Sequence, residues 1–365
     1  DGILHRLTSL PKALQPAIIY RIKIMSGMDI SEKRLPQDGR ITMRVGERVY
    51  DVRVSTNPVL HGENVVLRLL DKSNMLFSLE ELGFDAAGFT QIKEVVVPQS
   101  YGIILATGPT GSGKSTTLYA MLQRLNSETV HIVTVEDPVE YELPLVRQTQ
   151  VNPKAGLHFS TALRALLRQD PNIIMVGEIR DSETAQLAIQ AGLTGHLVLS
   201  SFHTNDASTA FTRLIDMGVE PFLVASCVLG VVAQRLLRKV CAQCQETYTP
   251  TASVLQSLQL WGAVPEDVTF VRGKGCALCG YTGYKGRVGI FEFLKNSPRI
   301  QEVVLKQSTT EAIRRAAADE GILTLRQVAL TKLLEGVTTA EEVLRVTPSD
   351  SGEWSEPSVD NSPSG

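Results

Sequence analysis

The chain has 365 residues and a mass of 39.8 kDa, which is enough for two or three domains of ordinary size. Hydrophobic residues make up 43% of it and charged residues 21%, so the composition excludes a chain that is disordered throughout. The chain has 36 basic and 39 acidic residues, and this slightly acidic balance argues against a protein built mainly to hold nucleic acid. The longest apolar stretch, Phe222–Ala233, is too short for a membrane-spanning helix, which needs about 20 residues.

The first seventy residues mix one helix with short strands. Pro16–Met25 has a helical pattern with apolar residues on one face. Three later stretches alternate like strands, the first two of them as a hairpin: Ile41–Val45, Val49–Val54 and Asn64–Leu70. After this the pattern loosens, and then Leu79–Val97 predicts a second helix.

From Gly102 onward, short apolar strands that end in polar residues alternate with helices. The predicted strands are Gly102–Thr107, His131–Glu136, Asn172–Glu178 and His196–Phe202, and the predicted helices are Ser115–Leu125, Phe159–Arg168 and Asp181–Ala191. This alternation predicts an α/β fold with a mainly parallel sheet that helices cover on both faces. Ligands of such sheets bind at the carboxyl ends of the strands, where the polar residues of this chain gather.

A phosphate-binding sequence lies between the first of these strands and the helix that follows. It reads Gly108-Pro109-Thr110-Gly111-Ser112-Gly113-Lys114-Ser115-Thr116 and fits the pattern G-x-x-x-x-G-K-[ST]. Its glycines let backbone N–H groups face phosphate oxygens, and the helix N-terminus adds partial positive charge. We expect Lys114 to reach the β- and γ-phosphates of ATP and the Ser115 hydroxyl to bind Mg²⁺. A chance match in a Gly-rich turn is the alternative, which the strand–loop–helix context disfavours.

Hydrolysis also needs a carboxylate that orients or deprotonates water. Two predicted strand ends supply one: Glu136, which opens the acidic segment Glu136–Glu140, and Glu178. A Walker B strand usually carries an acid where Gly177 stands here, so we assign that role to Glu178. The structural alternatives are a solvated turn at Glu136 and an acid at a helix N-terminus at Glu178.

Two histidines, His196 and His203, flank the last predicted strand. Either side chain could simply cap that strand. His203 lies at the carboxyl end of the sheet, where a group that senses the γ-phosphate belongs. Both histidines are therefore candidates for the catalytic site.

Four of the five cysteines form two C-x-x-C pairs, Cys241 with Cys244 and Cys276 with Cys279. Each pair can offer two thiolates to one ion, and together they predict a tetrahedral, structural Zn²⁺ site. Two disulfides are the alternative, which a reducing compartment disfavours for a nucleotide-binding chain without a secretion signal. Cys227 lies in the apolar stretch and is predicted to be a small buried residue.

Taken together, these motifs resemble the ATPases of bacterial type II secretion and type IV pilus assembly. The resemblance extends from about Leu7 to Thr347 and includes the phosphate loop, the four cysteines, Arg34–Arg40, Thr134–Glu140, Leu167–Pro171, Val176–Asp181 and Thr194–Asp206. It implies a homo-hexamer in the cytoplasm, bound to the inner membrane through platform proteins. In that ring the N-terminal domain of one subunit closes over nucleotide held by a RecA-like core.

The same resemblance implies that Arg40 and Arg53, with Arg68 as a third candidate, reach the γ-phosphate. From the sequence alone, each is equally compatible with an ordinary exposed strand residue.

Six parts follow along the chain from motifs and resemblance together. They are a PAS-like α+β domain at 1–72, a linker at 73–83, a RecA-like P-loop ATPase core at 84–238, a zinc subdomain at 239–293, a helical region at 294–347 and a disordered tail at 348–365. Because the chain opens on Asp1 with no signal peptide, and the family's further N-terminal docking domain is not recognisable in it, we expect a piece of a longer protein.

The predicted function is a motor ATPase that uses ATP and Mg²⁺, with a structural Zn²⁺, to drive pilus or pseudopilus assembly. The retraction ATPase of twitching pili is an alternative that the cysteine pairs disfavour, because that enzyme lacks them. A nucleic-acid motor with a zinc ribbon is an alternative from another class, and the acidic charge disfavours it, so we expect no direct nucleic-acid partner. A scaffold that binds ATP without turnover is a third, against which Glu178 argues. Secretion and pilus extension both stay open.

Overall fold

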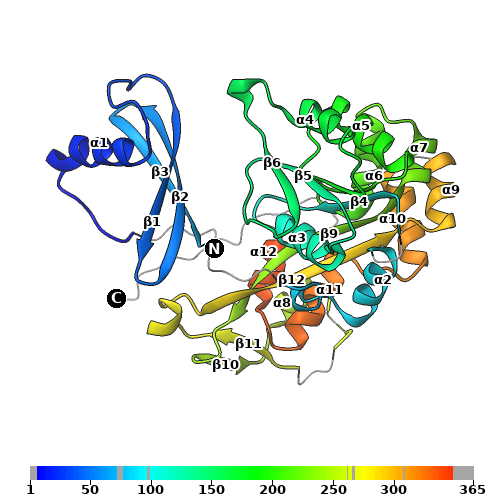
Figure 1. Ribbon diagram of the computed structural model, residues 1–365. Coiled ribbons are helices and arrows are strands. Elements are labelled where there is room, and N and C mark those ends of the chain that lie inside the picture. The colour runs from blue at the N-terminus through cyan, green and yellow to red at the C-terminus, as the bar shows by residue number, and fades with distance from the viewer. Residues whose placement is uncertain are drawn as a thin grey trace. The chain divides into compact units, whose positions relative to one another are not determined.

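The computed structural model describes residues 6–71, 77–96, 99–260, 262–264, 268–306 and 309–347. The chain divides into two compact units, Asp1–Leu76 and Phe77–Gly365, and each is described here by itself (Figure 1). The predicted disordered tail lies outside the described residues, as do residues 72–76 at the predicted linker.

The first unit is a three-stranded antiparallel sheet with one helix packed against it. The strands β1 (Gln37–Val45), β2 (Arg48–Val59) and β3 (Gly62–Asp71) confirm the predicted hairpin and third strand and are longer than predicted. The helix α1 (Gln15–Met25) follows the short 3-10 helix η1 (Lys12–Leu14).

The buried face of α1 contains a lysine beside its apolar residues. Ile19 and Lys23 are the buried side chains of this helix, whereas Ile24 and Met25 are exposed. The ammonium of Lys23 is buried because it lies 2.5 Å from the carboxylate of Glu63 and donates a hydrogen bond to the carbonyl of Glu32. An ion pair therefore helps to attach this face of the helix to the sheet.

The second unit contains a seven-stranded sheet in the order β12-β9-β4-β8-β7-β5-β6. Its strands are β4 (Gly102–Thr107), β5 (Ile132–Glu136), β6 (Val146–Gln150), β7 (Ile173–Val176), β8 (Leu197–Phe202), β9 (Val228–Val240) and β12 (Tyr284–Lys295). All neighbours pair in parallel except β12, which runs antiparallel to β9 along one edge. The α/β fold and all four predicted strands are confirmed.

Three of these strands were not predicted. The edge strand β6 is largely polar, so it lacks the apolar pattern of a buried strand. The apolar stretch Phe222–Ala233 is shared between the helix α7 (Pro221–Cys227) and the first half of β9. Cys227 ends α7 and is buried, as predicted.

Helices cover both faces of the sheet because the side chains of its strands alternate between them (Figure 1). On β4, Ile103 and Leu105 join a core that α4 to α7 and α9 to α12 complete. The other face packs on α2 and α3. The remaining helices are α2 (Ala86–Val96), α3 (Lys114–Leu125), α4 (Phe159–Leu166), α5 (Ser182–Leu193), α6 (Ala207–Asp216), α8 (Ala252–Ser257), α9 (Pro298–Lys306), α10 (Thr310–Asp319), α11 (Leu325–Leu334) and α12 (Ala340–Val346), with short 3-10 helices η2 (Leu79–Leu82), η3 (Pro153–Ala155) and η4 (Ala277–Cys279).

The predicted helix Leu79–Val97 is divided into two. The 3-10 helix η2 ends at Gly83, whose φ of 96° is left-handed, and α2 begins three residues later. A left-handed glycine ends a helix at little steric cost, and the pattern of apolar residues does not register it.

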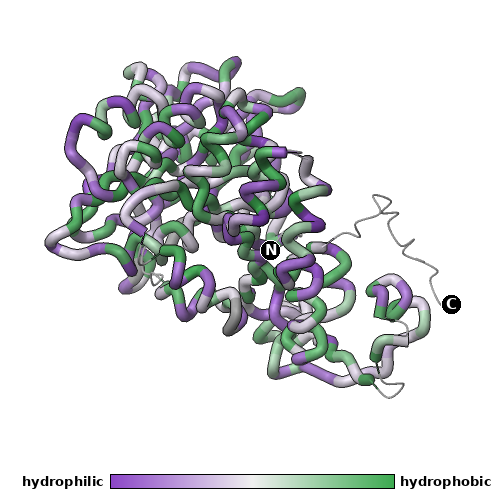
Figure 2. The backbone as a smooth tube through the Cα atoms, turned by 90° about the vertical axis from the view of Figure 1, so that its right-hand side faces the viewer, coloured by the Kyte–Doolittle hydropathy of each residue, from purple (hydrophilic) through white to green (hydrophobic). Residues whose placement is uncertain are grey.

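The cysteine segment adds a two-stranded sheet of β10 (Gln245–Tyr248) and β11 (Phe270–Gly273). It shares one hydrophobic core with the large sheet, to which Leu237, Phe270 and Val328 all belong. The boundaries predicted at 238 and 293 fall inside β9 and β12, and the division of this unit into subdomains stays a prediction. In Figure 2 the hydrophobic stretches are short, and every helix in the described ranges is too short or too polar to cross a bilayer.

Candidate functional site

The phosphate loop leaves the carboxyl end of β4 and opens α3, as its motif predicts. Gly108, Gly111 and Gly113 have φ values of 149°, 79° and 94°, which favour glycine. A Cβ atom on Gly108 would also lie 2.5 Å from the carbonyl oxygen of Gln234, so a larger residue does not fit there. The glycines of the motif therefore allow both the left-handed backbone of the loop and its close contact with β9.

Lys114, the first residue of α3, is largely buried beneath the loop. Its ammonium donates hydrogen bonds to the carbonyls of Gly108 and Pro109, at 2.8 and 3.1 Å. The pKa of Lys114 is lowered to about 8, mainly by burial, with the nearby Glu178 carboxylate opposing the shift and the charge of Arg235 adding to it. A bound anion would therefore stabilise the charged form of Lys114.

Glu178 and His203 come together beside Lys114, from the ends of adjacent strands. Glu178 follows β7, and one of its carboxylate oxygens lies 3.1 Å from Nε2 of His203, which follows β8. The other carboxylate oxygen pairs with Arg180. Nδ1 of His203 lies 3.5 Å from the Lys114 ammonium, so the three side chains form one chain of polar contacts.

Gly177 lies close to the neighbouring strand β5. A Cβ atom on Gly177 would lie 3.3 Å from the carbonyl oxygen of Val135 and 3.4 Å from Cα of Glu136 on β5. A side chain at 177 would be tightly placed against that strand, whereas the carboxylate of Glu178 reaches His203.

Glu136 has a different environment from Glu178. It is buried, and its carboxylate accepts hydrogen bonds from Tyr119, Thr134 and Gln148. Burial raises its pKa against the effect of these donors. Its oxygens hold α3 and β6 against β5, and β5 is separated from β4 by β7 and β8.

The structure does not bring His196 to the phosphate loop. This histidine precedes β8, whereas His203 follows it, so the two lie at opposite ends of the strand, about 20 Å apart. Nδ1 of His196 lies 3.0 Å from the carbonyl of Ala191 at the end of α5. His196 therefore contacts the end of α5. Of the two histidines, His203 is the one at the carboxyl end of the sheet, beside the phosphate loop.

Two residues at this edge were missed from the sequence, Gln234 and Arg235 on β9. Gln234 is buried against the loop, and Arg235 is half-buried with a guanidinium nitrogen 3.3 Å from the carbonyl of Asn205. Burial lowers the pKa of Arg235. The available signal in the sequence was a pair of polar residues directly after an apolar run. It points to the site only once Val228–Val240 is known to be a strand parallel to β4.

The candidate arginines of the first unit share one face of its sheet. Arg40 pairs directly with Arg53 across β1 and β2, and Arg53 pairs with Arg68 across β2 and β3. Residues directly opposite one another point to the same face, and like charges in that position cost stability. The register therefore concentrates positive charge in a row of three arginines, which the sequence alone did not reveal.

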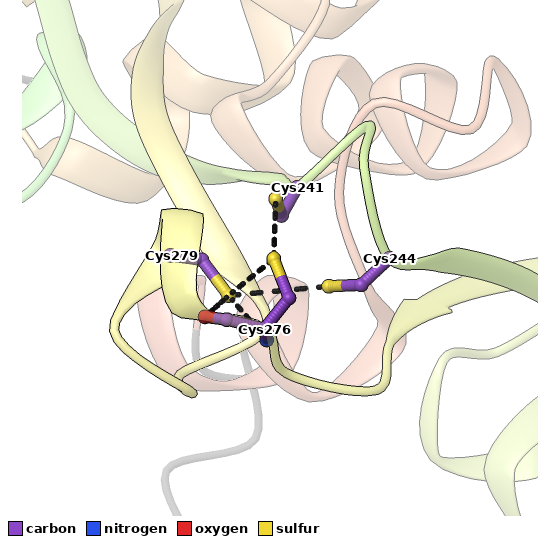
Figure 3. Close-up of side chains that lie close together, drawn as sticks. All are labelled: Cys241, Cys244, Cys276 and Cys279. Carbon is purple, nitrogen blue, oxygen red and sulfur yellow. Dashed lines mark hydrogen bonds between the residues drawn. The ribbon is translucent and has the colours of Figure 1, made fainter.

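The four cysteines of the C-x-x-C pairs converge on one point (Figure 3). Their sulfur atoms all lie within 4.8 Å of one another, and the measured contacts include 3.9 Å from Cys241 to Cys276 and 3.9 Å from Cys244 to Cys279. All four are free thiols, so the alternative of two disulfides is not found. Tetrahedral Zn²⁺ with Zn–S bonds of about 2.3 Å needs sulfurs about 3.8 Å apart, which this arrangement matches.

Each of the two cysteine pairs lies in its own turn, and the two turns are of the same kind. The N–H of Cys244 donates to the carbonyl of Cys241 at 3.1 Å, and the N–H of Cys279 donates to that of Cys276 at 3.1 Å. Gly273 and Gly283 let the backbone segments around the site touch, because a Cβ atom on Gly273 would lie 2.1 Å from the Gly283 carbonyl oxygen. The four-thiol donor set is therefore preformed by backbone geometry.

Comparison with known proteins supplies relatives for this arrangement. The family model described as "Type II/IV secretion system protein" matches residues 1–345. Type II secretion system protein E of Dickeya dadantii is 50% identical over 95% of this chain and 68% of its own length. Type IV pilus assembly ATPase PilB of Thermus thermophilus is 49% identical over 95% of this chain, which spans 39% of that relative. The crystal structure of the pilus retraction motor PilT with bound ADP matches with a TM-score of 0.62 and 26% identity, over 87% of this chain and 79% of that one.

Proposed function

Because the chain belongs to the type II/IV secretion system protein family, we propose that it is a motor ATPase whose hydrolysis of ATP drives the assembly of a pilus or pseudopilus. The observation that carries this proposal is the convergence of the phosphate loop, His203 and Glu178 at one edge of the sheet. Turnover of ATP by the purified chain, measured as phosphate release, tests it. A chain that binds ATP and releases no phosphate would instead be a nucleotide-gated scaffold.

We assign a role to each group of the site on the basis of its position. Backbone N–H groups of the loop and the N-terminus of α3 bind phosphate oxygens, and Lys114 neutralises their charge. Glu178 orients or deprotonates the attacking water, and His203 fixes the direction of the Glu178 carboxylate. Mg²⁺ fits the exposed hydroxyl of Ser115 at the start of α3 and would supply charge neutralisation on the phosphates.

Similarity favours assembly over retraction. Identity is 50% to a type II secretion protein and 49% to a pilus assembly ATPase, against 26% to the retraction motor. The four-thiol cluster agrees with this choice, since the retraction ATPases are expected to lack it. We therefore place the chain with the motors that extend pili or pseudopili.

By the same resemblance, we propose that the protein works as a homo-hexamer at the cytoplasmic face of the inner membrane, through platform proteins and without direct contact to nucleic acid. In this ring Arg40 and Arg53 would act on nucleotide that another subunit holds. The register of the three arginines supports this role, because it places three guanidinium-bearing side chains on one face of the sheet.

We propose that Cys241, Cys244, Cys276 and Cys279 hold one structural Zn²⁺. We expect about one zinc per chain by metal analysis of the purified protein, because a closed tetrathiolate site contributes folding energy directly. Cys276→Ser should lose the zinc and unfold the turns that carry the four cysteines, whereas Cys227→Ser, which changes the cysteine outside the cluster, should keep the zinc. Zinc content near zero with four titratable thiols would contradict the assignment.

Nucleotide affinity should fall at alkaline pH. Lys114 has a pKa of about 8 in the nucleotide-free protein, and bound phosphate must raise it, so binding above pH 8 takes up a proton. The affinity for ADP should therefore be nearly constant below pH 8 and fall by up to about tenfold per pH unit above it. Titrations of ADP from pH 7 to 9.5 measure this, and Lys114→Arg, which stays charged, should remove the pH dependence. Constant wild-type affinity across that range would refute it.

A further inference from the structure

We infer that Gln234 is a positioning residue of the phosphate loop, whose side-chain amide orients the Gly113 N–H toward the bound phosphate. The inference rests on the proposed nucleotide binding at this loop. Gln234 lies on β9, outside the phosphate-binding motif, and the inference gives it a role in nucleotide binding.

The contact itself is specific and fully enclosed. Gln234 is 1% exposed, and its Nε2 donates a hydrogen bond to the carbonyl oxygen of Ser112 at 2.9 Å. β9 pairs in parallel with β4, and Ala233 lies opposite Thr107, so Gln234 is the first residue beside the start of the loop. A Cβ atom on Gly113 would lie 3.1 Å from this same Nε2, which shows how closely the amide approaches the loop.

Peptide geometry converts this contact into a direction for an N–H group. The carbonyl of Ser112 and the N–H of Gly113 belong to one planar, trans peptide, so they point in opposite directions. Holding the carbonyl toward β9 therefore turns the Gly113 N–H away from β9. In a loop whose N–H groups cradle phosphate, the orientation of each peptide must be set before the ligand arrives.

The buried amide of Gln234 uses only its donor half in this position. The Gln234 Oε1 atom is buried and has no hydrogen-bond partner among the described residues. Burying an amide with one half unused costs stability, and an apolar side chain of the same size would avoid that cost. The donated hydrogen bond to the loop is what an apolar residue would lose.

Asn296 supplies a matched control beside the start of β9, away from the phosphate loop. It follows β12 and is buried, and its Nδ2 donates to the carbonyls of Ala225 and Val228, at 2.8 and 2.6 Å. Its Oδ1 is also buried without a partner among the described residues. It is thus a buried amide with the same chemistry that touches no residue of the phosphate loop.

The test measures ADP affinity and nucleotide-free melting temperature for Gln234→Met, Gln234→Leu and Asn296→Leu, in the chain as it exists. Methionine keeps the length of the side chain and removes the donor. We expect Gln234→Met to melt within a few degrees of wild type while its Kd for ADP rises at least tenfold. Asn296→Leu should leave the Kd unchanged, whatever its melting temperature.

Three results would overturn the inference. The first is a Gln234→Met chain that folds and binds ADP as wild type does. The second is a loss of ADP affinity in Asn296→Leu as large as that in the Gln234 variants. The third is failure of both Gln234 variants to fold while Asn296→Leu folds, which would make Gln234 a structural residue. Failure of the wild-type chain to bind ADP would refute the proposed function instead, so the two failures are distinguishable.

Discussion

Glu178→Gln should bind ATP and hydrolyse it about 10²- to 10⁴-fold more slowly than wild type, the loss expected when a general base is removed. Glutamine keeps the size of the side chain and can still contact His203, but it cannot accept a proton from water. Because Glu178 is not part of the phosphate loop, ATP should accumulate uncleaved in this variant. Nucleotide binding and phosphate release, measured on the same preparation, separate the two effects.

Two further variants make this result specific. Lys114→Ala should lose affinity for ATP together with turnover, because it removes the cation beneath the loop. Glu136→Gln should mainly lower thermal stability, because Glu136 accepts hydrogen bonds from Tyr119 and Gln148 that hold α3 and β6 to β5. If Glu178→Gln turns over ATP at nearly the wild-type rate, the assignment is wrong and Glu136 or Glu140 becomes the candidate base.

The phosphate edge of the sheet could be predicted from the sequence because its signals are local. A strand, a Gly-rich turn and a helix follow one another within 24 residues, from Gly102 to Leu125. The four predicted strands, β4, β5, β7 and β8, are short apolar runs that end in polar residues, which is the pattern of a parallel strand buried on both faces. The cysteine pairs have a spacing that specifies their chemistry even though β10, β11 and α8 lie between them.

The remaining features depend on pairings between distant segments. Gln234 and Ser112 are 122 residues apart in the sequence, and the sequence around neither residue predicts their hydrogen bond. The row of Arg40, Arg53 and Arg68 exists because of strand register, which a shift by one residue would destroy. His196 and His203 were both candidates from the sequence, and the structure separates them by the length of β8.

Mixing two inactive chains should restore part of the ATPase activity if Arg40 acts between subunits. Arg40→Ala keeps the phosphate loop and loses the arginine, and Lys114→Ala does the reverse. In a mixed ring, about one interface in four should join an intact phosphate loop to an intact arginine, since each side is drawn from the mixture with equal chance. Each arginine of this kind contributes about 10³- to 10⁵-fold in rate, because it meets charge that develops only in the transition state.

The measurement is phosphate release by each chain alone and by the two mixed in equal amounts, with co-assembly verified by pull-down of one tagged chain with the other. Both separate chains should be nearly inactive, and the mixture should recover a measurable fraction of wild-type turnover. Lys114→Ala mixed with Glu178→Ala is the matched control, because both changes lie in the second unit, whose loop and carboxylate belong to one site. That pair should stay inactive. If the Arg40→Ala mixture co-assembles and stays inactive as well, then Arg40 serves nucleotide held by its own chain, and the proposed action between subunits is refuted.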